Sequence, residues 1–290
     1  MKKDSARQHM TRQHMLSSNY EIYHYMDKTI RNVKLHHHDF YEIYFFISGD
    51  VEYYIEGEIY KLKPGDLVLI NTTELHQAQI NKCDKNYERI VLWINKEFLK
   101  GLSSENTDIA NCFESEDKKT IINIDFDIQR DIESLFHKLL ELDKFKGIGK
   151  DLLADAYMTE LMVKINNLAV DEKQVYDNET KKSALIDDMI GYIEDNICDE
   201  LTIDFLAEKF YLSKYHLSRE FKKYTNVSIH KFIKLKRLIQ AKEHILQNES
   251  ITDVYIKCGF GDYSNFFRAF KQEYGITPKQ FYKIMKNKDA

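Results

Sequence analysis

The stretch SKYHLSREFKKYT, residues 213–225, has the pattern of a short amphipathic helix. One side carries apolar residues at helical spacing, Leu217, Phe221 and Tyr224. A second face carries polar and cationic residues at positions i, i+3, i+4 and i+7, namely Tyr215, Ser218, Arg219 and Lys222. Ser213 precedes them as a good N-cap. The pattern is typical of a helix that enters a DNA major groove, although an ordinary amphipathic helix with a solvated cationic face has the same pattern.

The composition is that of a globular protein whose charge is unevenly distributed. Of the 290 residues, 43% are hydrophobic and 31% are charged, and the net charge is −5. From residue 181 onward, 19 Lys and Arg face 15 Asp and Glu, a net charge of +4. Residues 209–237 hold nine basic residues and a single acid, Glu220. A basic segment of helical sequence is a candidate binding site for a polyanion.

The sequence has no feature of a membrane span, a secretion signal or a disulfide framework. No apolar run approaches the roughly 20 residues that a span requires. The basic N-terminus, MKKDSARQHMTRQHM, precedes no apolar segment, so we expect a mobile arm rather than a signal. The cysteines are far apart and form no CxxC pair: Cys83, Cys112, Cys198 and Cys258. We therefore expect a cytoplasmic protein with no membrane partner.

Residues 33–94 are expected to form a small antiparallel barrel or jelly roll. Five short segments are rich in aromatic and β-branched residues: 40–47, 51–55, 58–62, 67–70 and 87–94. Turn residues lie between them at 48–50, 56–57 and 63–66. Short strands joined by close turns, without an intervening helix, favour an antiparallel barrel.

Two amphipathic helices and a linker are expected after the barrel. Residues 127–142 and 150–168 carry apolar residues at helical spacing and join near Gly147 and Gly149. The two helices either form a dimer interface, which we favour, or cover the barrel. Residues 170–182 contain few apolar residues and have the composition of a linker.

The C-terminal part is expected to contain two related helix-turn-helix units. Ser183 and Thr202 are predicted to cap two helices that precede the stretch 213–225, and a helix over residues 228–247 follows it. The pattern then repeats with a helix over 252–258, a turn, and a helix over 263–274 capped by Asp262 and ended by Gly275. Three residue pairs, each 49 positions apart, relate the units: Arg219 and Arg268, Phe221 and Phe270, Lys222 and Lys271.

The C-terminal part resembles the AraC family of bacterial transcription regulators. The residues that carry the resemblance lie within 185–286: Leu206, Ala207, Ser213, Leu217, Ser218, Arg219, Phe221, Lys222, Arg237, Ala241, Ile251, Gly259, Phe260, Asp262, Phe266, Arg268, Phe270, Lys271, Gly275, Thr277 and Pro278. Two residues depart from the family pattern, Asn226 in place of Gly and Tyr255 in place of a small Ala. The resemblance implies a homodimeric regulator that binds double-stranded DNA and acts with RNA polymerase, commonly as an activator.

The exposed faces of the two predicted recognition helices supply groups suited to DNA. Arg can pair with guanine and Asn with adenine, so we expect base contacts from Tyr215, Ser218, Arg219, Ser264, Asn265 and Arg268, with Tyr263 beside them. The lysines are expected to meet phosphates: Lys214, Lys222, Lys223 and Lys271. The second helix-turn-helix unit is nearly neutral, so we expect the first helix-turn-helix unit to contribute more of the affinity for DNA.

The N-terminal part is similar to the cupins. The residues that match the spacing of the two cupin motifs are His36, His38, Glu42, Gly49, Pro64, Gly65, Asp66 and His76. The second motif departs from the usual pattern at Asn71 and Thr73, where Pro and Gly are usual. The resemblance implies a small-molecule effector site, for which we expect a sugar because aromatic and polar groups lie together: His36, His38, Glu42, Tyr44, His76 and Trp93. In metal-binding cupins His36, His38, Glu42 and His76 would be the ligands. Cupins joined to DNA-binding domains are thought to use the pocket without metal, so we expect no metal or other cofactor.

These features predict an α+β chain of several parts. A cupin-like effector domain with an N-terminal arm is expected in 1–125, a helical dimerisation segment in 126–170, a linker in 171–182 and an AraC-type DNA-binding domain in 183–290. The helix-turn-helix units fall at about 202–225 and 251–275. We predict an effector-responsive transcription activator and no enzymatic activity. The alternative, a metal-dependent cupin enzyme with an accessory helical domain, leaves the repeated units unexplained, and the sequence has no P-loop, GxGxxG or GxSxG motif.

Overall fold

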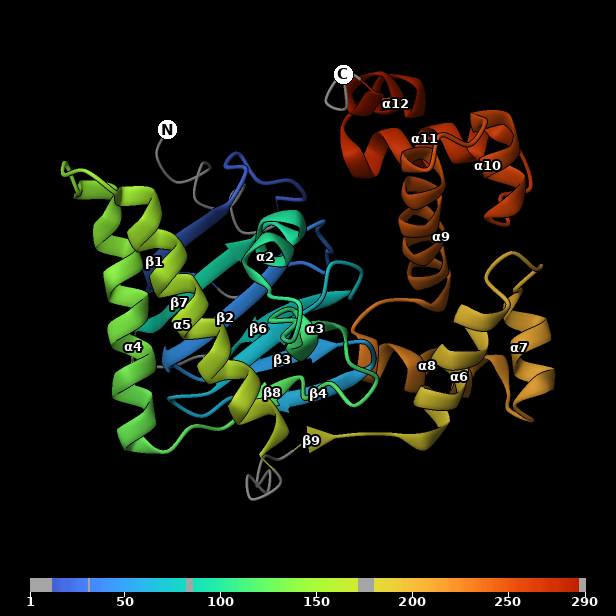
Figure 1. Cartoon of the computed structure of the whole chain (residues 1–290). Helices are drawn as coiled ribbons and strands as arrows, with labels where there is room; N and C mark the ends of the chain where they lie inside the picture. The colour runs from blue at the N-terminus through green and yellow to red at the C-terminus, as the bar shows by residue number, and fades with distance from the viewer. Residues whose placement is uncertain (1–11, 31, 82–85, 172–179, 287–290) are drawn as a thin grey trace. The chain divides into compact units, whose positions relative to one another are not determined.

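The computed structural model describes residues 12–30, 32–81, 86–171 and 180–286 (Figure 1). The chain divides into two compact units, one of residues 1–55 and 60–180 and the other of residues 56–59 and 181–290. The first contains antiparallel β-sheets and helices, and the second is helical. The predicted α+β fold class is therefore confirmed. Residues 1–11 of the expected arm, residues 172–179 of the expected linker, and Cys83 lie outside the described residues.

The described strands form two sheets. The five-stranded sheet has the order β1-β7-β2-β5-β8, with bounds Tyr20–Asp27, Tyr87–Ile94, Tyr41–Ser48, Leu67–Ile70 and Ile121–Ile122. The second sheet has the order β6-β3-β4-β9, with bounds His76–Ile80, Val51–Ile55, Glu58–Lys61 and Thr180–Lys181. The five expected strands are present within one residue of their predicted bounds. Strands β1 and β6 were not predicted, because their sequences, YEIYHYMD and HQAQI, are too polar to give a clear apolar alternation.

Strand β2 separates two hydrophobic cores because its side chains alternate between the faces of the sheet. Tyr41, Ile43 and Phe45 pack on the side that the helices cover. Tyr44 and Phe46 point into the interior between the sheets. Since both faces are buried, the strand is apolar along most of its length apart from Glu42, which is 5% exposed. This places one carboxylate inside the barrel.

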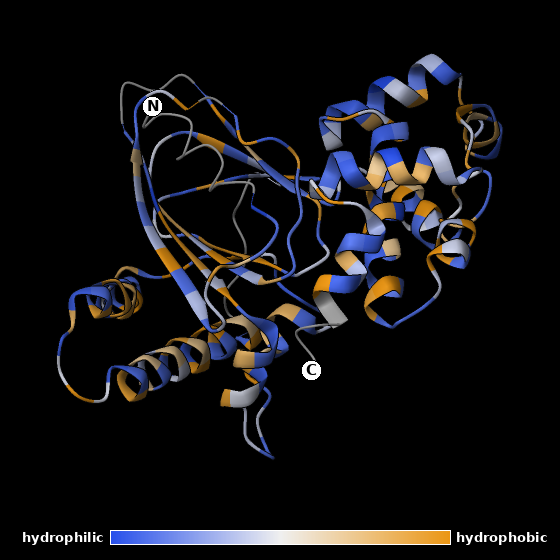
Figure 2. Cartoon of the chain, turned by 90° about the horizontal axis from the view of Figure 1, so that it is seen from above, coloured by the Kyte–Doolittle hydropathy of each residue, from blue (hydrophilic) through white to orange (hydrophobic). Residues whose placement is uncertain are grey.

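Helices cover the outer face of the five-stranded sheet. Their bounds are α2 Lys96–Leu102, α3 Asn111–Glu114, α4 Phe126–Glu141, the 3-10 helix η1 Leu142–Lys144, and α5 Lys150–Val170. Figure 1 shows α4 and α5 running side by side. Figure 2 shows hydrophobic and hydrophilic residues sharing the same helices, as expected when only one face of a helix is buried. The two helices predicted after the barrel are thus present.

The second unit consists of seven described helices. Their bounds are α6 Ala184–Asp195, α7 Ile203–Lys209, α8 Lys214–Thr225, α9 Ile229–Leu246, α10 Ile251–Lys257, α11 Tyr263–Tyr274 and α12 Pro278–Lys286. Helix α9, whose 18 residues span about 27 Å, carries α6 to α8 near one end and α10 to α12 near the other (Figure 1). No helix among the described residues is long and apolar enough to cross a membrane.

Local capping interactions set most of these helix boundaries. Thr202, Ser213 and Asp262 accept hydrogen bonds from backbone N–H groups in the first turns of α7, α8 and α11, as predicted. Asn226 ends α8 in the left-handed conformation, with φ of 56°, and its N–H donates to Lys222 O at 2.8 Å. Ser183 occupies the N-cap position of α6, but its side chain makes no capping hydrogen bond, so that prediction was wrong in its mechanism.

The turn at Gly259 can hold only glycine without strain. Its φ is +72°, and a Cβ there would lie 2.8 Å from the carbonyl oxygens of Ile197 and Cys198 and 2.9 Å from Arg237 Cζ. Gly261, two residues later, has no such neighbour within 4 Å and no positive φ. The two glycines therefore differ in backbone conformation and in the space available for a side chain.

We predict that Gly259→Ala lowers the free energy of unfolding by about 1–3 kcal/mol, because it adds left-handed strain and a backbone clash. Gly261→Ala serves as the matched control and should change it by less than about 0.5 kcal/mol. Urea unfolding of the full chain, followed by circular dichroism, measures both. Equal stability of the two variants would contradict the close packing of this turn.

Candidate DNA-binding surface and effector pocket

Helix α8 presents a cationic, solvent-exposed face. Its apolar residues Leu217 and Phe221 are fully buried, which anchors the helix to α9 through a contact between Phe221 and Phe232. On the other side Tyr215 is 75% exposed and the Arg219 side chain 57%. The anchor fixes the helix, and the exposed side chains remain available to a partner.

The cations of this face have only weak partners within the protein. Arg219 Nη2 lies 3.3 Å from His216 Nδ1 and 3.4 Å from Glu220 Oε1. Glu220 also pairs with Lys223 at 3.5 Å. Desolvation raises the pKa of its carboxyl group, but Lys223, Arg219 and His216 together outweigh it, so the pKa is lowered. Lys214 pairs with Asp204 of α7. Exposed pairs of this kind contribute little energy, so phosphates or bases can replace them.

Helix α11 repeats this arrangement in the second helix-turn-helix unit. Phe266 and Phe270 are fully buried, whereas Ser264, Asn265, Arg268 and Lys271 are exposed. Arg268 Nη2 donates to Asn265 Oδ1 at 2.6 Å, so the two candidate base-reading groups are held together. Tyr263, 41% exposed, packs against the ring of Tyr255, which replaces the small residue expected in α10. The unusual Tyr255 therefore buttresses the start of the second recognition helix.

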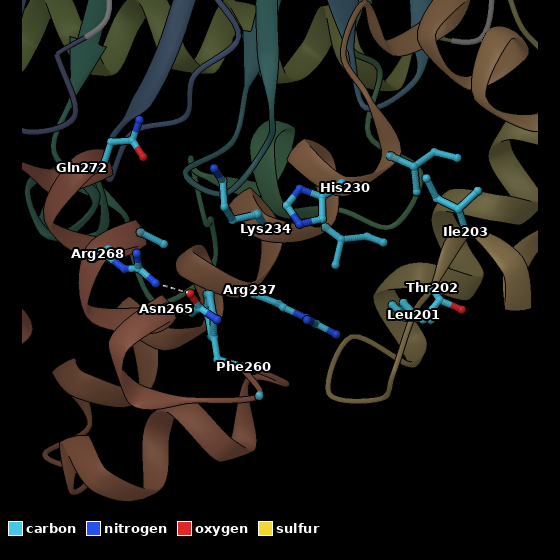
Figure 3. Close-up of a pocket in the computed structure, with 14 residues that line it drawn as sticks. Leu201, Thr202, Ile203, His230, Lys234, Arg237, Phe260, Asn265, Arg268 and Gln272 are labelled. Atoms are coloured by element: carbon cyan, nitrogen blue, oxygen red, sulfur yellow. Dashed lines mark hydrogen bonds between the residues drawn. The ribbon is translucent and has the colours of Figure 1, made fainter.

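A groove of about 790 Å³ lies within the second unit, between the start of α7, one face of α9 and α11 (Figure 3). Its lining includes four basic side chains, His230, Lys234, Arg237 and Arg268. His230 and Lys234 were not among the expected DNA-binding residues. They occur in a long helix and outside the recognition stretches, so only the lysine-rich composition of residues 209–237 pointed to them.

Arg237, which lines this groove, makes structural hydrogen bonds to backbone carbonyls. Its Nε donates to Ile197 O at 2.9 Å and its Nη2 to Asp199 O at 2.6 Å. These bonds tie α9 to the loop between α6 and α7. The turn at Gly259, which belongs to the second helix-turn-helix unit, packs against the same loop. Arg237 thus fixes the position of the two helix-turn-helix units relative to each other.

The interior of the first unit contains a small polar pocket. The cavity measures about 20 Å³, room for about one water molecule. Four of the expected effector residues line it: His36, Glu42, Tyr44 and Trp93. His38 and His76 lie next to it, with ring centroids 4.8 Å apart. Residues outside the expected effector-binding set also line it: Tyr25, Tyr53, Tyr87 and Arg89.

Glu42 is the charged centre of this pocket. Trp93 Nε1 donates to Glu42 Oε2 at 2.7 Å, and Tyr53 Oη donates to Oε1 at 3.4 Å. Burial alone would raise the pKa of Glu42, but the contacts with His38, His36 and Trp93 outweigh it and lower the pKa. The carboxyl group is therefore ionised at neutral pH although it is buried.

The histidines beside Glu42 behave differently. Burial, aided by the neighbouring His38, lowers the pKa of His36 to about 4. Burial also lowers the pKa of His76 well below its usual value. Both imidazoles are consequently neutral at pH 7.

A cationic side chain, Arg89, also lines the pocket. It is completely buried, donates to Asp27 Oδ2 at 2.5 Å, and lies over the rings of Tyr87 and Tyr25 at 4.0 and 4.7 Å. Arg12, near the start of the described chain, lies over the Trp93 ring at 5.0 Å. The pocket therefore combines aromatic faces with groups of both charges.

The structure brings together only part of the four-residue metal set that the cupin resemblance implies. Among the described residues, His38, Glu42 and His76 have ligand atoms within 4.8 Å of one another. His36 lies beside this group, with its ring centroid 4.2 Å from that of His76. Strand β2 begins at Tyr41, so His36 and His38 lie in the segment before it. The preceding segment is irregular, so its side chains do not follow strand parity.

Comparisons with known proteins agree with both units. A model described as an AraC-like ligand binding domain matches residues 19–162, and one described as a helix-turn-helix domain matches residues 206–284. The chain is 25% identical over 262 residues to the HTH-type transcriptional activator RhaS of Salmonella paratyphi A, covering 88% of each chain. The RhaS of Salmonella typhimurium shows the same identity and coverage.

Two solved structures illustrate the range of similarity. Fatty-acid-bound ToxT of Vibrio cholerae is 14% identical, covers 92% of this chain and 95% of its own, and has a TM-score of 0.40. The C-terminal domain of the response regulator yesN of Fusobacterium nucleatum is 31% identical, covers 34% of this chain and 99% of its own, and has a TM-score of 0.34. The matches to the two family models cover most of the chain and follow the two units seen here. The chain therefore belongs to the AraC family of transcription regulators, with a ligand-binding domain followed by a helix-turn-helix DNA-binding domain.

Proposed function

We propose that this regulator is a cytoplasmic transcription activator that reads two consecutive major-groove segments and responds to a sugar. The observation that carries the DNA-reading part is the pair of exposed recognition helices, α8 and α11, at opposite ends of α9. The length of α9, about 27 Å, is close to the roughly 34 Å of one DNA turn. The activator role, and with it a contact to RNA polymerase, rests on the similarity to RhaS, which is named an activator.

Each of the two recognition helices is assigned both base contacts and phosphate contacts. We assign base contacts to Tyr215, Ser218 and Arg219 in α8 and to Ser264, Asn265 and Arg268 in α11, with Tyr263 at their edge. Phosphate contacts fall to Lys214, Lys222, Lys223 and Lys271. Helix α8 has the larger cationic face and supplies more of the salt-dependent affinity.

We expect Arg219→Ala to weaken binding to the preferred site by about 1–3 kcal/mol and to relax the preference at one base pair, because a bidentate contact to guanine is lost. The site is first selected from random DNA with the wild-type chain, and affinities are then measured for all single-base variants of that site. Arg130→Ala, which removes an exposed arginine from α4, is the control and should bind as the wild type does. An equal loss on every DNA sequence would show that Arg219 touches only phosphate.

The effector is proposed to bind in the pocket around Glu42. Ionised Glu42, neutral His36 and the hydroxyls of Tyr44 and Tyr53 can hydrogen-bond sugar hydroxyls, and Trp93 offers a ring for stacking. The present cavity of about 20 Å³ is too small for a sugar, so binding must rearrange the surrounding side chains. A ligand that binds only the rearranged state shifts the protein toward it, as a regulator requires.

Trp93 is the only tryptophan of the chain, which makes intrinsic fluorescence a direct measure of this pocket. A sugar effector should change the fluorescence saturably and raise the melting temperature of the full chain. Glu42→Gln should weaken the response about tenfold or more through the lost charged hydrogen bonds, whereas Glu97→Gln, at an exposed position of α2, should not. A panel of sugars that leaves both fluorescence and melting temperature unchanged would contradict the sugar assignment.

Homodimerisation through α5 completes the proposal. Leu152, Ala156, Val163 and Val170 fall on one line of this helix, and Leu152, Val163 and Val170 are 70%, 41% and 68% exposed. An apolar stripe on an exposed helix suits a two-fold contact with a second copy of the chain.

We predict that the wild-type chain sediments as a dimer and that Leu152→Asp shifts it toward the monomer, because the charge would be buried unpaired at the contact. Ser134→Asp, an exposed position on α4, is the control and should leave the dimer intact. Sedimentation velocity over a concentration series distinguishes them. A dimer that survives Leu152→Asp would place the interface elsewhere.

A further inference from the structure

The groove between α7, α9 and α11 is lined by basic side chains and by no acidic one. Fourteen described residues line it, and none of them is an Asp or a Glu, although the chain as a whole has 47 acidic and 42 basic residues. Figure 3 shows His230 and Lys234 of α9 in the middle, with Arg268 of α11 on one side and the start of α7 on the other. Such a groove attracts an anion rather than a cation.

Lys234 has no partner for its ammonium group among the described residues, although its side chain is half-buried. Two neighbouring cations of α9 differ in this respect. Lys236 lies 2.7 Å from Glu194, and Arg237 donates to two backbone carbonyls. Partial burial of an unpaired charge is costly, so an anion from outside the chain would stabilise Lys234.

The rest of the lining suits a sugar–phosphate chain. Its apolar part consists of Ile229 and Ile233 of α9 and Phe260 of the turn before α11. Apolar surface can pack against deoxyribose, while the amide of Gln272 can donate to a phosphate oxygen. The groove measures about 790 Å³, far more than one small ion needs.

The position of the groove indicates which anion it binds. One wall is the start of α7 in the first helix-turn-helix unit, and the other is α11, the recognition helix of the second. Asn265 and Arg268, to which we assign base contacts, also line the groove. When two recognition helices occupy consecutive major-groove segments on one face of DNA, the intervening minor groove and its phosphate backbones face the protein between them. The groove lies between the two helix-turn-helix units, where those phosphates would pass.

We propose that Lys234, with His230 beside it, binds the DNA phosphate backbone along the minor groove between the two major-groove segments. Helix α9 is then a third DNA-contacting element and more than a spacer between α8 and α11. The inference rests on the proposed reading of two consecutive segments. A phosphate contact carries no base information, so it contributes affinity for every DNA sequence.

A free small anion, such as inorganic phosphate, is the competing occupant because its chemistry is the same. The two sources differ in one measurable respect. Only a contact to the DNA backbone makes binding depend on the charge of a phosphate at a particular place in the duplex.

The test combines Lys234→Gln with duplexes in which single phosphates are replaced by uncharged methylphosphonates. The duplex is the site selected from random DNA with the wild-type full chain, and fluorescence anisotropy gives the affinities. In the wild type, neutralising a contacted phosphate beside the central minor groove should weaken binding on the order of fivefold to tenfold near 0.1 M salt. In Lys234→Gln the same replacement should cause no further loss, because the partner charge is already absent.

Salt dependence and base preference provide a second measurement. Lys234→Gln should reduce the slope of log affinity against log salt by about 0.9 and weaken all single-base variants of the site equally. Lys234→Arg keeps the charge and should restore the slope. Lys271→Gln, a matched variant in α11, should instead lose its sensitivity to phosphates of the second major-groove segment. Lys100→Gln, at an exposed position of α2, should behave as the wild type does.

Methylphosphonates that weaken the wild type and Lys234→Gln equally at every central position would overturn the proposal. So would wild-type binding that no central methylphosphonate weakens, a result that does not require any variant to fold. Saturable binding of inorganic phosphate that is lost in Lys234→Gln, with DNA affinity unchanged, would assign the groove to a free anion and also overturn it. A wild-type chain without a preferred DNA site would contradict the proposed function, whereas a preferred site without a central phosphate effect would contradict this inference alone.

Discussion

The hydrogen bonds from Arg237 to the carbonyls of Ile197 and Asp199 are the constraint on which the DNA-binding unit depends. They tie α9 to the loop before α7, and the turn at Gly259 packs against the same loop. One side chain therefore positions both helix-turn-helix units. Because DNA presents its major-groove segments at a fixed repeat, two recognition helices can be used together only if their separation is fixed in this way.

A second constraint, the ionised carboxylate of Glu42, organises the interior of the ligand-binding unit. Trp93 and Tyr53 donate to it, and His38 lies next to it. A buried charge is stable only when such partners surround it, so a ligand that enters must replace or use these partners. This makes the pocket sensitive to what binds there. The same property supports the proposed sugar response.

The sequence predicted the helical unit more completely than the barrel because helices are specified by local signals. Capping residues such as Ser213, Thr202 and Asp262 act within four residues of the chain and were recognised correctly. Strands β1 and β6 were missed because their polar residues are stabilised by partners far along the chain. Strand β1, for example, pairs with β7 about 70 residues later.

The sequence by itself determined the family, the two helix-turn-helix units and the chemistry of their exposed faces, since spacing along a helix dictates which side chains share a face. Only the tertiary structure revealed that Arg89 and three tyrosines line the pocket, that Arg237 joins the two DNA-reading units, and that His38, Glu42 and His76 converge while His36 lies beside them. These arrangements arise from contacts between residues that are distant in the chain. The spacing of apolar residues along the sequence does not reveal such contacts, because it describes only neighbours within one helix or strand.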